Sequence, residues 1–456
     1  MEGNLLMKCD MLIKDAAMMT PDFEIAEHRT IIVHRSRIVE IGTYEELKAK
    51  YEPEHTLDGK GKLCMPGLVD AHTHTCQQLL KGRTMDELPM IWSRILVPFE
   101  GNLDEEDVRV SAQMSCLEMI KSGTTAFADA GGVHMQRTVE AAVESGMRAA
   151  ITRSAIDIGD FLPNSMKQSA QEIIDNNEWL YKTYHGAGDG RIHIWFGIRQ
   201  VMSCSPELIQ AAAEKARQYN TGLHAHLAEH RDEVRYCLET YKKRPAEYLD
   251  SLGALGPNLL TAHNVVYSEA ELALLKERNV NIVHCPRVNF NSHGIPKTPQ
   301  MLRMGMNVGL GSDGASSSNL SLFDEMRVFR SGIHVFWGLP VFDPVVLPAK
   351  ELVKMATMGS AKALLLEREI GTVEEGKKAD LILINIDQPH ISPAHSLINM
   401  IVESVTSKDV EDVIIDGKLV MRNREVLTLD EERILYESKR RMKSTAEKAG
   451  IWQGVL

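Results

Sequence analysis

The sequence predicts an α/β protein: a (β/α)8 barrel of the TIM type with a small β-sandwich domain built from both chain ends. Two observations lead to this fold class. In the middle of the chain, eight short apolar β runs alternate with stretches of helical periodicity, as in a barrel of parallel strands. Near both ends, short β-branched runs are separated by turn residues. A chain of 456 residues is long enough for one large domain and a smaller one.

The terminal β runs come first and last in chain order. Those near the start cover 11–13, 30–33 and 37–41, and similar runs return at 379–385, 413–415 and 418–421. Asp416 and Gly417 suit the tight turn of a hairpin between the last two runs. We therefore expect 1–65 and 366–430 to form the two parts of the β-sandwich, 66–365 the barrel, and 431–456 a charged helical tail.

The barrel elements alternate between these two parts. The candidate strands are 64–71, 124–129, 148–153, 192–199, 222–227, 259–263, 280–285 and 308–313. The candidate helices include 104–122, 135–144, 206–219, 269–278 and 349–365. In a barrel of this kind the functional side chains lie at the carboxyl ends of the strands.

Composition narrows the class of protein. The chain has 51 Lys and Arg against 63 Asp and Glu, a formal net charge of −12, which argues against binding to nucleic acid or to a membrane surface. Its seven cysteines are dispersed without any C-x-x-C pair, as expected for reduced thiols. The sequence has neither a signal-peptide pattern nor an apolar run of membrane-spanning length. We therefore expect a soluble, cytoplasmic protein.

Two histidines mark the end of the first barrel strand. His72 and His74 alternate along it, so both side chains lie on one face, where two imidazoles can hold a metal ion. A short His-x-His pattern also arises by chance, and two incidental polar residues after a buried strand are about as frequent.

A second pair of histidines lies on the fifth strand. His226 is nearer its carboxyl end and is the third candidate ligand, whereas His224 lies deeper and is expected to pack or form a hydrogen bond. Glu229 follows the strand, where a carboxylate can carry a proton from water to a substrate. A solvated loop carboxylate is the alternative for Glu229.

The sixth and eighth strands each end in one further polar residue. His263 could support a water molecule or serve as a base, and Asp313 could bind a metal and accept a proton. Taken alone, His263 would be a core histidine and Asp313 a helix cap. Because all these residues end predicted barrel strands, together they indicate a single site.

The motifs resemble those of the amidohydrolase superfamily, in the branch that contains methylthioadenosine/S-adenosylhomocysteine deaminases and triazine hydrolases such as atrazine chlorohydrolase. The resemblance covers nearly the whole chain. It rests on the segments 66–74, 122–125, 224–229, 284–286, 311–314 and 371–381, which read PGLVDAHTH, SGTT, HAHLAE, HCP, GSDG and GTVEEGKKADL.

This resemblance implies a mononuclear metal site and an aminohydrolase mechanism. The implied metal ligands are His72, His74, His226 and Asp313, with Glu229 as proton shuttle and His263 as support for the attacking water. A bound metal would make hydroxide available near neutral pH. Histidine and carboxylate donors suit Zn²⁺, Fe²⁺ or Mn²⁺, and the resemblance favours Zn²⁺. The expected reaction is attack of water on a ring carbon of an aromatic nitrogen heterocycle, with release of ammonia.

The candidate substrate contacts only partly follow the nucleoside deaminases of this branch. Trp92 and Glu100 match a tryptophan and a glutamate that binds ribose hydroxyls, and Arg153 resembles an outer contact. Arg199 stands in place of a histidine, and Asn289 follows Val288 where these relatives have Ser-Asn. Arg199 favours a carbonyl-rich or anionic heterocycle, with a structural salt bridge as its alternative role. Glu100 could equally be a helix-start carboxylate.

Three functions therefore compete. The first is a deaminase of a purine, nucleoside, pterin or related ring, including S-adenosylhomocysteine or methylthioadenosine. The second is a triazine-type hydrolase that releases an amine or chloride. The third is a barrel without catalysis that serves as a binding or assembly protein. In each case the partner is a small heterocycle or a second copy of the chain, since relatives are often homo-oligomers.

Overall fold

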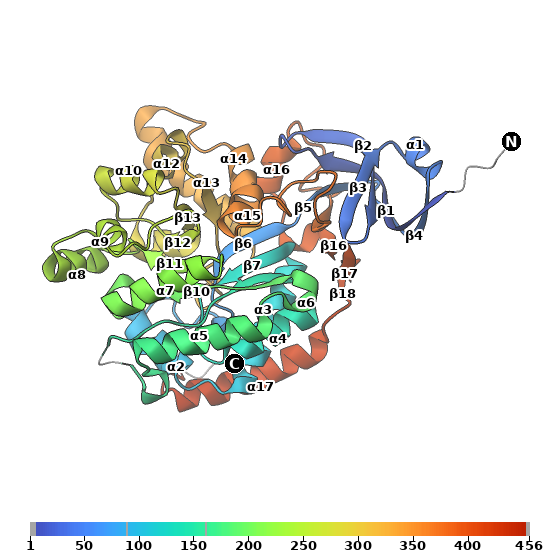
Figure 1. The fold of residues 1–456 in the computed structure, drawn as a ribbon. Helices are drawn as coiled ribbons and strands as arrows, with labels where there is room; N and C mark the ends of the chain where they lie inside the picture. The colour runs from blue at the N-terminus through green and yellow to red at the C-terminus, as the bar shows by residue number, and fades with distance from the viewer. Residues whose placement is uncertain (1–5, 88–89, 160–161, 453–456) are drawn as a thin grey trace.

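Both ends of the chain contribute to one nine-stranded sheet in the computed structural model, which describes residues 6–87, 90–159 and 162–452 (Figure 1). The strand order is β18-β17-β16-β15-β5-β1-β2-β3, with β4 paired to β1. β15 and β5 are antiparallel neighbours, with Leu383 opposite Cys64, and join the two ends of the chain. The strands are β1 (Met7–Met19), β2 (Ile25–His34), β3 (Arg37–Gly42), β4 (Tyr51–Asp58), β5 (Lys62–Pro66), β15 (Leu381–Asn385), β16 (Val410–Ile415), β17 (Lys418–Arg422) and β18 (Glu425–Val426).

The middle of the chain forms two parallel sheets that fit a TIM-like barrel. One has the order β6-β7-β8-β9 and the other β10-β11-β12-β13-β14, and a single residue, Trp195, separates β9 from β10. The backbone N–H of Asp313 donates to the carbonyl of His72 at 2.9 Å, which joins the segment after β14 to β6. The strands are β6 (Leu68–Thr73), β7 (Thr124–Asp129), β8 (Arg148–Ile151), β9 (Ile192–Ile194), β10 (Phe196–Ile198), β11 (Leu223–Leu227), β12 (Leu259–His263), β13 (Asn281–His284) and β14 (Val308–Leu310).

Glycine permits the close approach between β14 and β6. A Cβ atom on Gly311 would lie 2.7 Å from the carbonyl oxygen of His72, which is too close for any other residue. The sequence indicated a strand that reaches Asp313. In the structure β14 ends at Leu310, so Asp313 lies three residues beyond it. The predicted strand 64–71 likewise divides at Gly67 into β5 of the outer sheet and β6.

The predicted helices are present with ends shifted by one or two residues, except the last. Capping boxes at Asp104 and Ser268 begin α3 and α10. The predicted helix 349–365 is divided by a π turn at Met355–Gly359, where Gly359 meets the carbonyl of Val308. The longer helices are α3 (Glu105–Lys121), α4 (Met135–Ser145), α5 (Ala170–Tyr184), α7 (Pro206–Gln218), α8 (Arg231–Tyr241), α9 (Pro245–Ser251), α10 (Glu269–Glu277), α13 (Leu322–Ile333), α14 (Ala349–Lys354), α16 (Leu397–Glu403) and α17 (Glu431–Lys448).

The charged tail helix α17 lies against α3 (Figure 1). Arg441 pairs with Asp107 at 2.8 Å and Lys121 with Glu431 at 2.8 Å, so ion pairs connect the two helices. In the described part of the chain, none of the helices combines the length and apolar character that crossing a bilayer requires.

A buried ion pair links the two sheet systems. Arg148, on β8, donates to both carboxylate oxygens of Asp380 at 2.9 and 3.0 Å, and the three side chains of this cluster, Arg148, Asp380 and Asp416, are buried.

We expect Arg148→Met to lower the free energy of unfolding by about 3 kcal/mol, because the buried Asp380 would lose its counter-charge. Urea titration measures this. Lys418→Met removes the exposed pair with Asp189 and should cost no more than about 1 kcal/mol; equal losses would contradict the assignment.

Glu325, on α13, predicts a pH-dependent contribution to stability. Its carboxylate accepts the N–H of Arg287 at 2.9 Å, and burial raises the pKa of Glu325 from about 4.5 to about 8. Between these values the folded chain holds a proton that the unfolded chain has released, so stability falls as pH rises. Glu325→Gln should therefore be more stable than wild type at pH 8.5 by about 4 kcal/mol and nearly equal near pH 4.5. Urea unfolding at both pH values tests this, and a constant difference would contradict it.

Candidate metal centre and active site

Histidines from β6 and β11 meet an aspartate at the carboxyl ends of the parallel strands. His72 Nε2 lies 3.0 Å from Asp313 Oδ1, and His74 Nε2 lies 3.5 Å from the same oxygen. His226 Nε2 is 3.3 Å from His74 Nε2. The structure thus brings together all four residues that the sequence proposed as metal ligands.

His263 joins this cluster from β12. The potential ligand atoms of His72, His226, His263 and Asp313 all lie within 4.8 Å of one another, so these four could also surround an ion. His263 Nε2 is buried and has no hydrogen-bond partner among the described residues. The Nε2 atoms of His74 and His226 face each other, and His263 Nε2 lacks a partner; a divalent metal ion would provide one for such nitrogens. Histidines together with a carboxylate are suitable ligands for such an ion.

Burial keeps the histidines of β6 and β11 in their neutral, metal-binding form. It lowers the pKa of His72, and it lowers the pKa of His74 and His226 well below the ordinary value, with the neighbouring Arg199 acting in the same direction on the last two. His224 lies deeper on β11, with Nε2 2.8 Å from His72 Nδ1, and so fixes the orientation of the His72 ring. This is the hydrogen-bonding role that the sequence indicated for it.

Glu229 lies just beyond β11 and faces two histidines. Its Oε1 is 3.8 Å from His263 Nε2 and 3.3 Å from His293 Nε2, while Gln200 Nε2 donates to Oε2 at 2.6 Å. Burial opposes ionisation, but His263 and His293 outweigh it and hold the pKa of Glu229 at about 2. Although burial also opposes a charge on His263, Glu229 and Asp313 raise the pKa of its imidazole. Glu229 is therefore ionised, and its charge lies beside the His263 imidazole without a direct hydrogen bond between them.

A buried carboxylate on α8 holds the segment that carries Glu229. Glu233 accepts the backbone N–H of Ala228 at 3.0 Å and of Glu229 at 2.9 Å. Ala228 has φ +50°, a left-handed conformation that costs energy for a residue with a side chain. Glu233 thus stabilises a strained turn that aims Glu229 at the metal cluster.

We expect substitutions of Glu233 to lower kcat in order of the hydrogen bonds they remove. Glu233→Gln retains one acceptor oxygen and should lose about tenfold, whereas Glu233→Ala retains none and should lose up to about 10²-fold. The metal content should stay unchanged, because Glu233 does not contact the ligand atoms. Steady-state kinetics with metal analysis tests this; equal losses in both variants, or loss of metal, would contradict a positioning role.

The residues proposed to contact a substrate lie in different surroundings. Asn289 is a partner of His263: its Oδ1 lies 3.0 Å from His263 Nδ1, so it orients that ring. Arg199 and Glu100 form a buried pair at 3.3 Å, and Gln77 also donates to the same Glu100 oxygen at 2.7 Å. The salt bridge considered for Arg199 is therefore present. Trp92 packs in a small apolar cluster with Val97 and Ile156.

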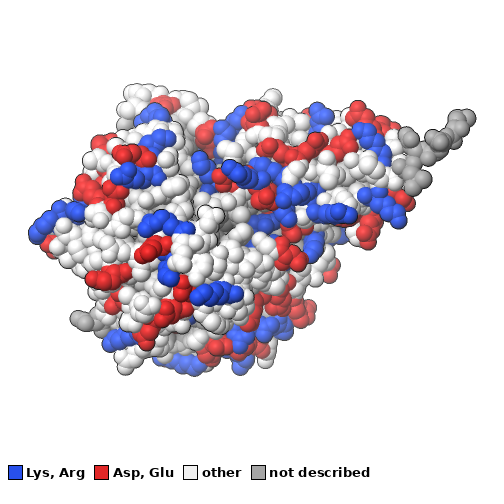
Figure 2. Space-filling view, viewed as in Figure 1, with Lys and Arg blue, Asp and Glu red and all other residues white. Residues whose placement is uncertain are grey.

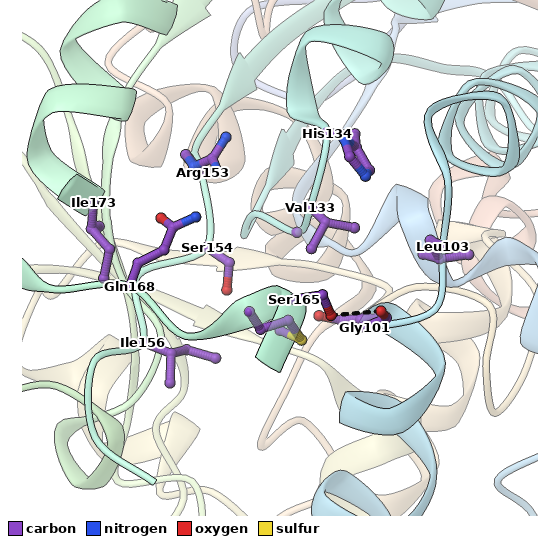
Figure 3. A pocket seen from close by; sticks show the side chains of 13 residues that line it. Gly101, Leu103, Val133, His134, Arg153, Ser154, Ile156, Ser165, Gln168 and Ile173 are labelled. Carbon is purple, nitrogen blue, oxygen red and sulfur yellow. Dashed lines mark hydrogen bonds between the residues drawn. The ribbon is translucent and has the colours of Figure 1, made fainter. Parts of the chain in front are cut away.

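A cavity of about 100 Å³ lies beside Glu100 (Figure 3). Arg153, Ser154 and Gln168 line it together with Glu100, and His134 lies across the cavity from Arg153. The second carboxylate oxygen of Glu100 and the hydroxyl of Ser154 are buried without a hydrogen-bond partner in the described structure. The cavity therefore presents polar groups that a small ligand could satisfy.

Three residues of the site were not predicted from the sequence: His293, Gln200 and Glu233. Gln200 follows directly after β10, and His293 lies in the segment after β13, so a search of the loops that follow the parallel strands could have found both. Glu233 gave no comparable signal, because a glutamate in the first turn of a helix is usually a surface residue.

Comparison with known proteins finds one family model and several similar proteins that are named as deaminases. Residues 63–420 match the model of the amidohydrolase family. A 5-methylthioadenosine/S-adenosylhomocysteine deaminase of Pelotomaculum thermopropionicum is 37% identical over 437 residues, covering 95% of this chain and 98% of the relative. A 5'-deoxyadenosine deaminase of Methanosarcina mazei is 34% identical over 436 residues, covering 94% and 97%. The crystal structure of an adenosine deaminase from Xanthomonas campestris with bound zinc has a TM-score of 0.90 at 26% identity, covering 96% of this chain and 100% of that one.

Proposed function

The chain belongs to the amidohydrolase family, and from that premise we propose that it is a metal-dependent aminohydrolase that removes ammonia from the ring of an adenosine derivative. This proposal rests on one observation: Glu229 lies next to the cluster of histidines and Asp313. Potential metal ligands and a proton-carrying carboxylate lie within a few ångströms of each other at one end of the parallel strands. This is the arrangement that hydrolysis of a C–N bond in a cyclic amidine requires.

His72, His74, His226 and Asp313 are the metal ligands in this proposal. His263 is assigned to proton transfer instead, because its Nε2 lies 3.9 Å from Asp313 and 3.8 Å from Glu229, between the two carboxylates. The bound ion would lower the pKa of water from 15.7 toward about 7. We propose zinc, because the similar adenosine deaminase of Xanthomonas campestris contains bound zinc; Fe²⁺ and Mn²⁺ suit these donors as well.

The chain's own side chains then move the protons. Glu229 takes the first proton of the attacking water and delivers it to the ring nitrogen next to the carbon under attack, while Asp313 and His263 accept the second proton and return it to the departing amino group. The protonated ring is a better electrophile, and the tetrahedral adduct expels ammonia. Each well-placed proton transfer contributes about 10²–10⁴-fold to the rate.

The proposed substrate is an adenosine changed at its 5' position. Relatives named for 5-methylthioadenosine, S-adenosylhomocysteine and 5'-deoxyadenosine support this, as does the unpartnered oxygen of Glu100, which could accept a ribose hydroxyl. Trp92, Arg153 and Arg199 are proposed to complete the binding surface. Arg199, whose side chain is buried beside the metal cluster, favours a second candidate: a carbonyl-rich heterocycle, which would take the guanidinium as its donor.

A substrate panel separates the two candidates. Ammonia release should be fastest with 5'-methylthioadenosine, S-adenosylhomocysteine or 5'-deoxyadenosine, and slow with guanine, pterins and aminotriazines. Turnover of a free oxo-heterocycle in preference to every nucleoside would favour the second candidate and would contradict the role given to Glu100.

We also infer the domain arrangement that the sequence indicated. The two parallel sheets form one eight-stranded barrel over 66–365, with β9 and β10 as a single strand. Side chains of both sheets, among them Val69, Ala150, Leu260 and Val283, share one buried cluster, which supports closure. The nine-stranded sheet would then be the small β-sandwich domain of 1–65 and 366–430, followed by the tail 431–456. The seven cysteines are free and buried, as expected in a reducing compartment, and this supports a cytoplasmic location.

A further inference from the structure

An apolar segment projects from the molecule after α13. It comprises a π turn (His334–Gly338), a 3-10 turn (Leu339–Val341) and the residues up to 346. Figure 1 shows this segment in orange at the edge of the barrel, and Figure 2 shows a largely uncharged surface there. Six large apolar side chains in it are more than half exposed, with Phe342 at 94%: Val335, Phe336, Leu339, Val341, Phe342 and Val345. We call these six residues the 335–345 face.

The area of this face is close to what a specific protein interface needs. At on the order of 100 Å² for each exposed side chain, the six present roughly 600 Å². That is the upper end of the apolar patches found on monomers. Two copies of the face would bury roughly 1,200 Å², the lower end of specific protein–protein interfaces.

The charges of the segment select the kind of partner. Asp343 is the single charged residue between 334 and 346. The neighbouring cations Arg330 and Lys297 are paired with Glu403 at 2.9 Å and with Glu269 at 2.7 Å. A lipid surface or an acidic protein would need free basic groups here, and a basic partner would need a cluster of acids. An equally uncharged, apolar face is the better complement.

The face is also held in one conformation. Trp337 Nε1 donates to the carbonyl of Pro296 at 3.0 Å, the N–H of Asp343 donates to the carbonyl of Gly338 at 3.0 Å, and the N–H of Val345 donates to Asp343 Oδ1 at 3.0 Å. Phe342 has φ +53°, so a bulky side chain is kept in a costly backbone conformation with its ring in solvent. A preformed apolar face loses little conformational entropy on association.

We propose that the 335–345 face is a self-association surface, on which a second copy of this chain places the same face across a two-fold axis. A two-fold contact needs a patch that is complementary to itself, and an uncharged apolar patch meets that condition. This self-association is independent of the proposed reaction, because it changes the molar mass of the protein in solution and not the rate of ammonia release.

The test is the molar mass of the full metal-loaded chain by sedimentation equilibrium at micromolar concentration. Wild type should be a dimer or a larger assembly, and Phe342→Glu should raise its dissociation constant at least tenfold, since two like charges would face each other. Because Phe342 makes few contacts within its own chain, the circular dichroism spectrum should still show the native fold. Tyr436→Glu, on α17 and 67% exposed, is the matched control and should leave the mass unchanged.

A second measurement locates the contact. All seven native cysteines are buried, so Phe342→Cys adds an accessible thiol, and a short bismaleimide should join two such chains, whereas Tyr436→Cys should not cross-link. A monomeric wild type, an unchanged dissociation constant in Phe342→Glu, or cross-linking through Tyr436→Cys would each overturn the proposal. So would co-sedimentation of monomeric wild type with phosphatidylcholine vesicles, which would make the face a membrane contact.

Discussion

Glu229→Gln should retain its metal and lose about 10²–10⁴-fold in kcat. Glutamine keeps the size of the side chain and can still bond to Gln200, but it cannot carry a proton. The neighbouring His263 and His293 hold the pKa of Glu229 low before substrate binds, so the carboxylate is ready to accept a proton from the water and pass it to the ring. Ammonia release under saturating substrate measures the loss.

Two controls make this result specific. Glu239→Gln, at an exposed position on α8, should leave kcat and metal content as in wild type. A substrate that already carries a better leaving group should be affected less by Glu229→Gln than the amino compound. A variant that keeps more than about a tenth of wild-type kcat would exclude Glu229 as the proton carrier.

Removing a metal ligand should have the largest effect of all. His74→Ala and Asp313→Ala should each lose most of the metal and at least about 10³-fold in turnover, because water without the metal has a pKa near 15.7. His263→Asn should keep about one metal ion per chain and lose turnover only, since we place His263 between Asp313 and Glu229 and not on the metal.

This contrast decides between two ligand sets that the geometry allows. His263 Nε2 lies 3.9 Å from Asp313 Oδ1, and the potential ligand atoms of His72, His226, His263 and Asp313 all lie within 4.8 Å of one another. If His263→Asn lost the metal while His74→Ala kept it, the ligand set would be His72, His226, His263 and Asp313. Metal analysis of the purified variants, with circular dichroism to establish folding, distinguishes the two.

Much of the site could be predicted because it depends on short-range order. Alternation along a strand places His72 and His74 on one face, and the carboxyl ends of parallel strands meet at one end of the sheets, so His226 and Asp313 join them. The same argument placed Glu229 and His263. No knowledge of side-chain packing was needed for these residues.

The rest depends on contacts that sequence order does not reveal. Arg199 and Glu100 are 99 residues apart and pair only after folding. Glu233 matters because Ala228 adopts a left-handed conformation, which nothing in the sequence indicated. The π turn in the last predicted helix likewise follows from the close approach of Gly359 to Val308.

The central claim, that one metal ion at the histidine and aspartate cluster supports deamination, is tested most directly by removing and restoring the metal. The purified chain should contain about one divalent ion. After chelation it should stay folded and release no ammonia from 5'-methylthioadenosine, and one equivalent of Zn²⁺ should restore turnover. A folded chain that never binds metal, or one that deaminates equally well without it, would contradict the account.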